Sequence, residues 1–225
     1  MRAAVVAAAV VAALAAAAGT GAAGPHFSAR VDNPWFPLKP GTVYRYRGVK
    51  DGRASREVMT ITNRVEVVNG VPCVAVDDRL WLAGHLEERT TDWYSQDDHG
   101  NVWYFGERTA ELDRSGHVTS TEGSWRAGRD GALPGIFMFA QPRVGRSARQ
   151  EYYKGHAEDH FAVIARSTSV MVPWLHSSGA LLTKEWTPLE PGVVDHKYYV
   201  RGVGTVLEQT MRGGDERNEL VSVTP

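Results

Sequence analysis

The chain has 225 residues and a formal net charge of −1, with 25 Lys and Arg against 26 Asp and Glu. This balance excludes the basic surface that a nucleic-acid-binding protein needs, and no basic run indicates binding to a membrane surface. The single cysteine, Cys73, excludes an internal disulfide, and the apolar run 71–76 around it predicts a buried structural thiol rather than a reactive one. The length suits one all-β domain whose core is large enough to fold without disulfides.

The N-terminal residues have the pattern of a secretory signal peptide. Met1 and Arg2 provide a positive start, residues 3–18 contain only Ala, Val and Leu, and small residues follow from Gly19. A membrane-spanning helix needs about 20 apolar residues, which is more than this run supplies. We therefore predict a cleavable signal peptide over residues 1–23, a secreted, extracellular protein, and no membrane span in the mature chain.

Residues 24–40 predict an extended N-terminal arm. The prolines in the segment 33–37, Asn-Pro-Trp-Phe-Pro, forbid a helix there. Trp35 and Phe36 are large and apolar, so we expect them to pin the arm to the rest of the protein. The remaining residues, 41–225, are predicted to form a single β domain.

Short runs rich in β-branched and aromatic residues come next, separated by turn signals. Residues 42–48 and 57–68 predict strands. Asn69-Gly70 predicts a tight hairpin turn, because both residues tolerate the positive φ angles that such a turn requires. Residues 71–77 are then the partner strand of this hairpin.

A second hairpin is predicted around the turn-forming run 97–101. With Gln96 opposite Val102, Tyr94 faces Tyr104 on one side of the strand pair, which makes that face aromatic and polar. The run 97–101 has some likeness to a calcium loop but lacks the bidentate acid at its far end, so a plain turn is favoured. The strands of this hairpin are predicted at 88–96 and 102–107.

The segment 122–145 has no strand or helix periodicity and is interrupted by glycines and prolines. Irregular segments of this length are usually functional or disordered, and the apolar run 136–139 argues against disorder. We expect a long irregular lid that covers part of the domain.

Strands dominate the rest of the chain, and no helix of normal length is predicted in the mature protein. The further strands are predicted at 150–164, 167–173, 181–187, 193–200, 205–211 and 218–223. The fold class is therefore all-β: an antiparallel sheet curled into a lipocalin-like barrel, or a sandwich.

Several segments resemble a group of exported, β-rich proteins from high-GC bacteria. They are NPWFPLKPGT at 33–42, DWY at 92–94, GNVWYFGE at 100–107, EGSW at 122–125 and QEYYKG at 150–155. In addition, KYYVRGVG at 197–204 resembles a hairpin common in secreted and lipoprotein-type β domains. The resemblance implies export and a β architecture, and it brings no activity and no site residue to this chain.

His156, Glu158 and His160 form the densest polar pattern. They alternate along the predicted strand 150–164, so they project from one face. Two imidazoles and a carboxylate are suitable ligands for a divalent metal, the one cofactor that the sequence leaves open. Neighbours on one strand face are ~6–7 Å apart, so metal binding would need a bend. The alternative is a solvated polar face.

Asp159 is predicted on the opposite face of that strand, among apolar neighbours. A desolvated carboxyl has a raised pKa and can act as a general acid or base. The alternative is an internal ion pair with an arginine. Glu185 or His196 from later strands could meet Glu158 or Asp159 across a barrel and give the paired carboxylates of glycoside hydrolysis, unless these residues lie on a solvent face.

Three functions remain open from the sequence. The leading hypothesis is a barrel-like protein that binds a small apolar, aromatic or carbohydrate ligand in an aromatic-lined cavity. The second is an extracellular acid/base hydrolase or lyase that acts on a saccharide or another small substrate. The third is a structural or interaction module of the cell envelope. No nucleophile elbow, P-loop or dinucleotide fingerprint is present, and nothing indicates the oligomeric state.

Each hypothesis has its own candidate residues. For ligand binding they are Tyr94, Tyr104, Trp125, Tyr153, Glu185 and His196. For catalysis they are Asp159, Glu158 and His156. For a metal they are His156, Glu158 and His160.

Overall fold

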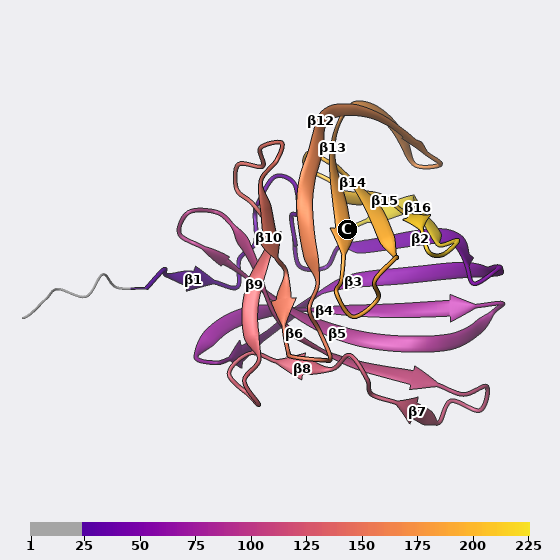
Figure 1. Cartoon of the computed structure of the whole chain (residues 1–225), viewed down its shortest axis with the longest axis horizontal. Helices are drawn as coiled ribbons and strands as arrows, with labels where there is room; N and C mark the ends of the chain where they lie inside the picture. The colour runs from indigo at the N-terminus through magenta and orange to yellow at the C-terminus, as the bar shows by residue number, and fades with distance from the viewer. Residues whose placement is uncertain (1–23) are drawn as a thin grey trace, which may run out of the picture.

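The computed structural model describes residues 24–225, and the predicted signal peptide, residues 1–23, lies outside them. Every regular element in the described part of the chain is a β-strand (Figure 1). The strands are β1 (Phe27–Ser28), β2 (Val43–Lys50), β3 (Arg53–Val68), β4 (Val71–Leu82), β5 (His85–Asp97), β6 (Val102–Leu112), β7 (Val118–Ser120), β8 (Trp125–Arg126), β9 (Leu133–Met138), β10 (Ser147–Arg149), β11 (Glu151–Tyr152), β12 (His160–Val172), β13 (Leu175–Trp186), β14 (Val194–Val200), β15 (Gly204–Arg212) and β16 (Arg217–Thr224). Between residues 24 and 225 there is no long apolar helix of the kind that crosses a membrane.

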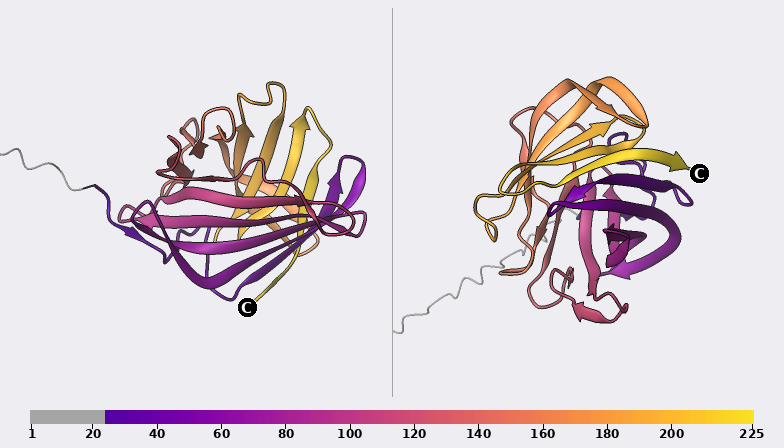
Figure 2. Two further views of the ribbon diagram at one scale, coloured as in Figure 1. Left: turned by 90° about the horizontal axis from the view of Figure 1, so that it is seen from below. Right: turned by 90° about the vertical axis from the view of Figure 1, so that its right-hand side faces the viewer.

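All strands belong to one antiparallel sheet that curls until its two ends nearly meet. Its main path is β10-β12-β13-β14-β15-β16-β2-β3-β4-β5-β6-β9-β11. Strands β2 to β6 and β12 to β16 wrap around a common interior (Figure 2). The two end strands, β10 and β11, are separated in the chain by Gln150 alone, so the backbone itself joins the edges of the sheet. The all-β, antiparallel and barrel-like fold predicted from the sequence is confirmed.

The first predicted hairpin is confirmed. Val68 lies opposite Val71, and the turn residues Asn69 and Gly70 have φ angles of 49° and 79°. Positive φ at both positions is the geometry for which the Asn-Gly pair is selected. A register shift between Ile61 and Val65 interrupts the pairing of β3 with β4, so β3 curves with the sheet.

The second hairpin has the predicted register. Gln96 lies opposite Val102, and Tyr94 lies opposite Tyr104. The turn between the two strands is a plain turn, because the carboxyl of Asp97 accepts hydrogen bonds from within the hairpin. The donors are the backbone N–H groups of His99 and Asn101 in the turn, at 3.0 and 2.8 Å, and Trp103 Nε1 on β6, at 2.8 Å.

The segment 122–145 differs from the expected lid in one respect. Residues Leu133–Met138 form strand β9, which pairs with β6 and β11 and is part of the barrel wall. Glycine and proline at the start of this strand hid it in the sequence. Gly135 is required there, because a Cβ at this position would lie within 2.5 Å of the backbone of Gln150. The remainder of the segment is turns and loops around the short strand β8.

The predicted strand 150–164 is wrong in its first half. Strand β11 ends at Tyr152, a turn occupies 153–159, and β12 begins at His160. Gly155 has a φ of 79°, and the backbone N–H of Gly155 donates to the Glu158 carboxyl at 2.7 Å. A positive φ and a side chain that bonds to nearby backbone both favour a turn over a strand.

The N-terminal arm packs on the domain as its aromatic residues suggested. Strand β1 pairs with β5, and Trp35 and Phe36 are buried in the core. Cys73 is fully buried as well, and burial raises the pKa of its thiol to about 12. The thiolate that reacts with electrophiles is therefore scarce at neutral pH, as expected of a structural cysteine.

Candidate functional site

The curled sheet lines two adjoining pockets, which share Tyr94, Phe137 and Lys197 and form the two chambers of one partly open pocket. The smaller chamber has a volume of about 120 Å³ and the larger one about 260 Å³. The smaller chamber is further lined by Phe36, Tyr46, Glu57, Met59, Asp78, Asp92, Thr205, Glu208 and Asn218. The larger chamber is further lined by Tyr104, Glu107, Gln150, Glu151, Asp159 and Glu185.

Strand register places one polar row across the half of the sheet that β13 to β16 form. Thr183 lies opposite Lys197, Lys197 opposite Glu208, and Glu208 opposite Asn218. Directly paired residues on neighbouring antiparallel strands point to the same face. These four side chains therefore share the inner face, although they are far apart in the sequence.

The other half of the sheet continues the polar row. Asp78 on β4 lies opposite Met59 on β3, and Asp92 on β5 lies opposite Glu107 on β6. Between the two halves, the amide nitrogen of Asn218 donates to the carboxyl of Glu57 on β3. Eleven strands of the sheet thus contribute polar or aromatic groups to one interior.

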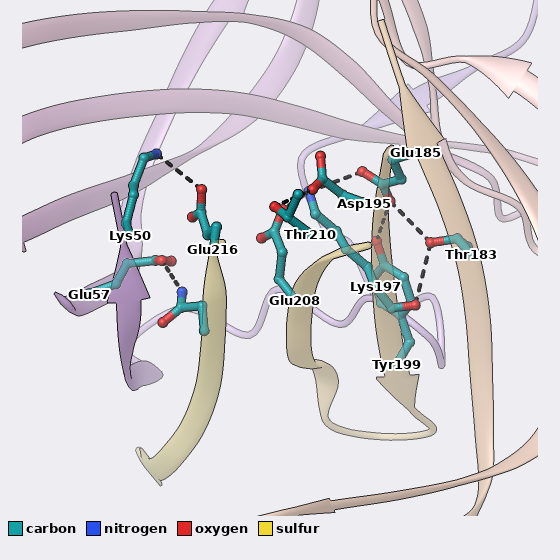
Figure 3. Close-up of polar contacts among 11 residues, drawn as sticks. Lys50, Glu57, Thr183, Glu185, Asp195, Lys197, Tyr199, Glu208, Thr210 and Glu216 are labelled. Carbon is teal, nitrogen blue, oxygen red and sulfur yellow. Dashed lines mark hydrogen bonds and ion pairs between the residues drawn. The ribbon is translucent and has the colours of Figure 1, made fainter. Parts of the chain in front are cut away.

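Lys197 lies between two carboxylates. Its Nζ is 3.0 Å from Glu185 Oε2 and 3.2 Å from Glu208 Oε1 (Figure 3). Glu185 also accepts hydrogen bonds from Thr183 Oγ1 at 3.1 Å and from the Tyr199 hydroxyl at 3.2 Å. Burial alone would lower the pKa of Lys197, but the two carboxylates raise it well above its ordinary value. Lys197 is therefore a fixed cation at physiological pH.

Tyr104 holds two carboxyls close together. Its hydroxyl is 2.7 Å from Asp92 Oδ1 and 3.1 Å from Glu107 Oε2. A phenol has one proton to donate, so the second contact is a hydrogen bond only when that carboxyl is itself protonated. Burial raises the pKa of Asp92 to about 7 and that of Glu107 well above its ordinary value, which is consistent with a shared proton.

In the larger chamber, Glu151 is buried almost as deeply as Glu185, the partner of Lys197. Glu151 Oε2 accepts a hydrogen bond of 2.6 Å from Trp125 Nε1. Burial, and then the nearby charge of Asp159, raise the pKa of Glu151 to about 8. Asp159 lines the same chamber but is exposed to solvent, so it lies at the mouth. Burial also raises the pKa of Glu57 to about 7 in the smaller chamber.

Aromatic rings form the remaining wall. Tyr94 and Tyr104 are stacked, with ring centroids 4.9 Å apart and planes at 20°. Phe137 approaches both rings at steeper angles, and Trp125 meets Tyr104 edge to face at 5.4 Å. The pocket therefore presents π faces beside carboxyl oxygens.

The structure brings some of the predicted ligand-binding residues to the pocket and leaves others outside it. Tyr94, Tyr104 and Glu185 line the pocket, and Trp125 supports it through Glu151. His196 does not line it, because strand alternation places His196 on the face opposite to Lys197.

Tyr153 is also outside the two chambers. Its ring stacks on His156 with centroids 4.4 Å apart, and it lines a separate surface pocket of about 390 Å³.

Of the predicted catalytic and metal residues, only Asp159 lines the pocket. His156 bonds to the Glu122 carboxyl at 2.8 Å, and His160 Nδ1 bonds to the backbone oxygen of Glu158 at 2.8 Å. The turn at 153–159 removes the strand alternation on which the three-ligand pattern depended. No group of three or more His, Cys, Asp or Glu side chains in residues 24–225 is arranged to hold a metal ion.

Sequence reasoning missed most of the acidic pocket. The missed residues are Glu57, Asp78, Asp92, Glu107, Gln150, Glu151, Lys197, Glu208 and Asn218. One signal was present: Asp92 shares a strand face with Tyr94, and Lys197 shares one with Tyr199. A charge among aromatic residues on one face marks a polar interior. The long-range pairs that bring these strands together carry no local signal.

Comparisons with known proteins add two similar structures. No protein-family model and no curated protein matches the chain. Among solved structures, the chain is similar to a Bacteroides fragilis protein described as exported and as having a YmcC-like fold, with 14% identity over 85% of this chain and 99% of that one and a TM-score of 0.48. It is also similar to a Parabacteroides distasonis protein described as a lipoprotein, with 11% identity over 85% and 99% of the two chains and a TM-score of 0.45. By its own fold and pocket, this chain is an all-β, barrel-like protein with an acidic, aromatic-lined interior.

Proposed function

We propose that this protein is exported and binds a small ligand in the two-chamber pocket. The proposal rests on one observation: an interior pocket in which stacked tyrosines and Phe137 lie beside buried amides and beside carboxyls that form no ion pair within residues 24–225. A barrel whose side chains served only as core would fill this space with apolar groups. Export is supported by the N-terminal pattern of residues 1–23.

Among the ligand classes open from the sequence, a carbohydrate fits the lining best. Carboxylates and amides accept and donate hydrogen bonds to hydroxyls, and a sugar ring presents an apolar face that packs on aromatic rings. A purely apolar ligand would leave Gln150 Nε2 and Asn218 Oδ1, which have no partner among residues 24–225, unsatisfied, and this would cost free energy for each buried polar group. The larger chamber, at about 260 Å³, suits a single ring.

Titration of intrinsic fluorescence tests the binding function, because Trp125 is hydrogen-bonded to the pocket residue Glu151. We expect saturable changes with members of a panel of mono- and disaccharides and small aromatic compounds. Asp159→Asn is expected to weaken binding about fivefold or more, since it changes the mouth of the larger chamber. Glu158→Gln is the matched control, one residue away in the turn outside the pocket. A flat response across the whole panel contradicts the function.

A second candidate function is acid/base hydrolysis of a saccharide. The observation that favours it is that Glu151 and Asp159 line the same chamber, where burial and then the nearby charge of Asp159 raise the pKa of Glu151 to about 8. A carboxyl that stays protonated at neutral pH can serve as a general acid, and an exposed carboxylate nearby can serve as base. Glu151 thus takes the place that sequence reasoning gave to Glu158.

Product analysis separates hydrolysis from binding. Catalysis requires that Glu151→Gln and Asp159→Asn each reduce turnover of a chromogenic glycoside by about a hundredfold or more, while Glu158→Gln retains it. Ligand binding without any product from the wild-type protein contradicts hydrolysis and leaves the binding function in place.

A further inference from the structure

The charges that line the two-chamber pocket are strongly out of balance. The lining contains eight carboxyls, and Lys197 is its one basic side chain within residues 24–225. Lys197 is already paired with Glu185 and Glu208. The other six carboxyls form no ion pair with any residue of this part of the chain.

By contrast, outward-facing acids on the same strands form ion pairs. Asp77, which precedes the pocket residue Asp78, pairs with Arg64, and Glu66 on β3 pairs with Arg126. The chain has 25 Lys and Arg, so basic side chains are not scarce. Their near absence from the interior indicates that the excess of carboxyls there is a property of the pocket.

Two buried amides point to a ligand independently of the charge. Asn218 is 6% exposed and lines the smaller chamber, and its Oδ1 has no hydrogen-bond donor among residues 24–225. Gln150 is 4% exposed and lines the larger chamber, and its Nε2 likewise has no acceptor there. Buried amide groups without partners cost free energy, so each calls for a complementary group. The smaller chamber therefore offers a site for an N–H or O–H donor at Asn218 Oδ1, and the larger one offers a site for an acceptor at Gln150 Nε2.

The aromatic lining suits a cation as well. Tyr94 and Phe137 line both chambers, so their rings lie where the chambers adjoin. The face of an aromatic ring attracts an ammonium group, and the attraction is larger where water is excluded. The smaller chamber, at about 120 Å³, has room for an amine and a short stem rather than for a ring.

We propose that the ligand of this pocket is an organic cation whose ammonium group is held in the smaller chamber by Asp92, Glu57 and Asn218 Oδ1. Its remaining part, with a hydrogen-bond acceptor for Gln150, occupies the larger chamber. This inference rests on the proposed binding function and specifies its ligand class. An amino sugar satisfies both the ring-sized chamber and the charge.

Pairs of probes that differ only in charge test the inference. The pairs are glucosamine and glucose, benzylamine and benzyl alcohol, and putrescine and 1,4-butanediol, each titrated near neutral pH and followed by intrinsic fluorescence and calorimetry. We expect the amine of at least one pair to bind about tenfold or more tighter than its neutral counterpart, which corresponds to about 1.4 kcal/mol.

Two pocket variants and one control locate the charge effect. Asp92→Asn keeps the hydrogen bond from Tyr104 but removes a carboxylate of the smaller chamber, so it should reduce the preference for the amine. Asp159→Asn, at the exposed mouth, repeats the test with little demand on folding. Asp77→Asn removes an outward-facing carboxylate paired with Arg64 and should leave the preference unchanged.

The outcomes separate the inference from the function on which it rests. Neutral probes that bind as tightly as the amines overturn the cation assignment and leave ligand binding intact. An amine preference that survives both Asp92→Asn and Asp159→Asn places the cation elsewhere and also overturns the assignment. The absence of binding by every probe overturns both the cation assignment and the binding function.

Discussion

The Tyr104 hydroxyl joins two pocket carboxyls from different strands, Asp92 on β5 and Glu107 on β6. Because the phenol supplies a single proton, the two acids and the hydroxyl form one hydrogen-bonded unit in which a carboxyl proton completes the second bond. The position of each acid therefore depends on Tyr104.

Tyr104→Phe is expected to destabilise the protein by about 1–3 kcal/mol, because it leaves two half-buried carboxyls without their shared partner while the ring and its packing remain. Urea unfolding followed by fluorescence measures the change. Tyr152→Phe is the control, since the Tyr152 ring contacts Arg149 and no hydrogen bond is formed by its hydroxyl within residues 24–225. Equal losses in the two variants would contradict the role given to the Tyr104 hydroxyl.

At the residue scale, the sequence identified those pocket residues whose neighbours are local. Tyr94 and Tyr104 were predicted to face each other because a short hairpin sets their register. Glu57 was not predicted, since its partner Asn218 is 161 residues away and comes from the last strand. Local patterning determines which face a side chain takes, and only the closed sheet determines what it meets.

At the scale of strands, the closure of the sheet depends on the seam between its ends. Strand β9 meets β11 there, and Gly135 on β9 packs against the backbone of Arg149 and Gln150. Gln150, whose Nε2 has no acceptor among residues 24–225, lies at this seam. The same residue therefore lines the pocket and takes part in closing the barrel.

Gly135→Ala is expected to destabilise the protein by about 3 kcal/mol or more, because its Cβ would collide with backbone that cannot move without opening the seam. Thermal unfolding followed by circular dichroism measures the loss. Gly179→Ala is the matched control, since its nearest neighbour would be the Ser177 hydroxyl at 3.9 Å. A Gly135→Ala variant as stable as Gly179→Ala would show that the seam tolerates separation.

Strands were predicted well where turn chemistry brackets them and poorly where glycine has a packing role. Asn69-Gly70 marks a turn by its positive φ angles, so the ends of β3 and β4 that flank it were located correctly, while both strands extend further at their other ends than predicted. In β9, Gly135 serves close approach instead of a turn, and its strand was interpreted as part of a lid. In the predicted strand 150–164 the opposite occurred, because the turn at Gly155 lies inside an apparently alternating pattern.

At the scale of the whole molecule, the acidic interior makes stability depend on pH. Burial raises the pKa of Glu57 and Asp92 to about 7 and that of Glu151 to about 8, while the unfolded values are near 4. The folded state therefore binds more protons than the unfolded state between about pH 4 and pH 8. In this window the free energy of unfolding decreases as pH rises, because the buried carboxyls must ionise in a pocket with one fixed cation.

The melting temperature is therefore expected to be roughly 5 °C or more lower at about pH 8.5 than at about pH 5.5. A change of a few kcal/mol in the free energy of unfolding shifts the melting temperature of a domain of this size by about that amount. Scanning calorimetry across the window measures the difference. Glu151→Gln should reduce it, because an amide does not titrate, whereas Glu158→Gln in the outer turn should leave it unchanged. An organic cation bound in the pocket should restore stability most strongly at the alkaline end, where the carboxyls are ionised. A melting temperature that rises with pH would mean that the interior already balances its charge, and it would remove the electrostatic basis for a cationic ligand.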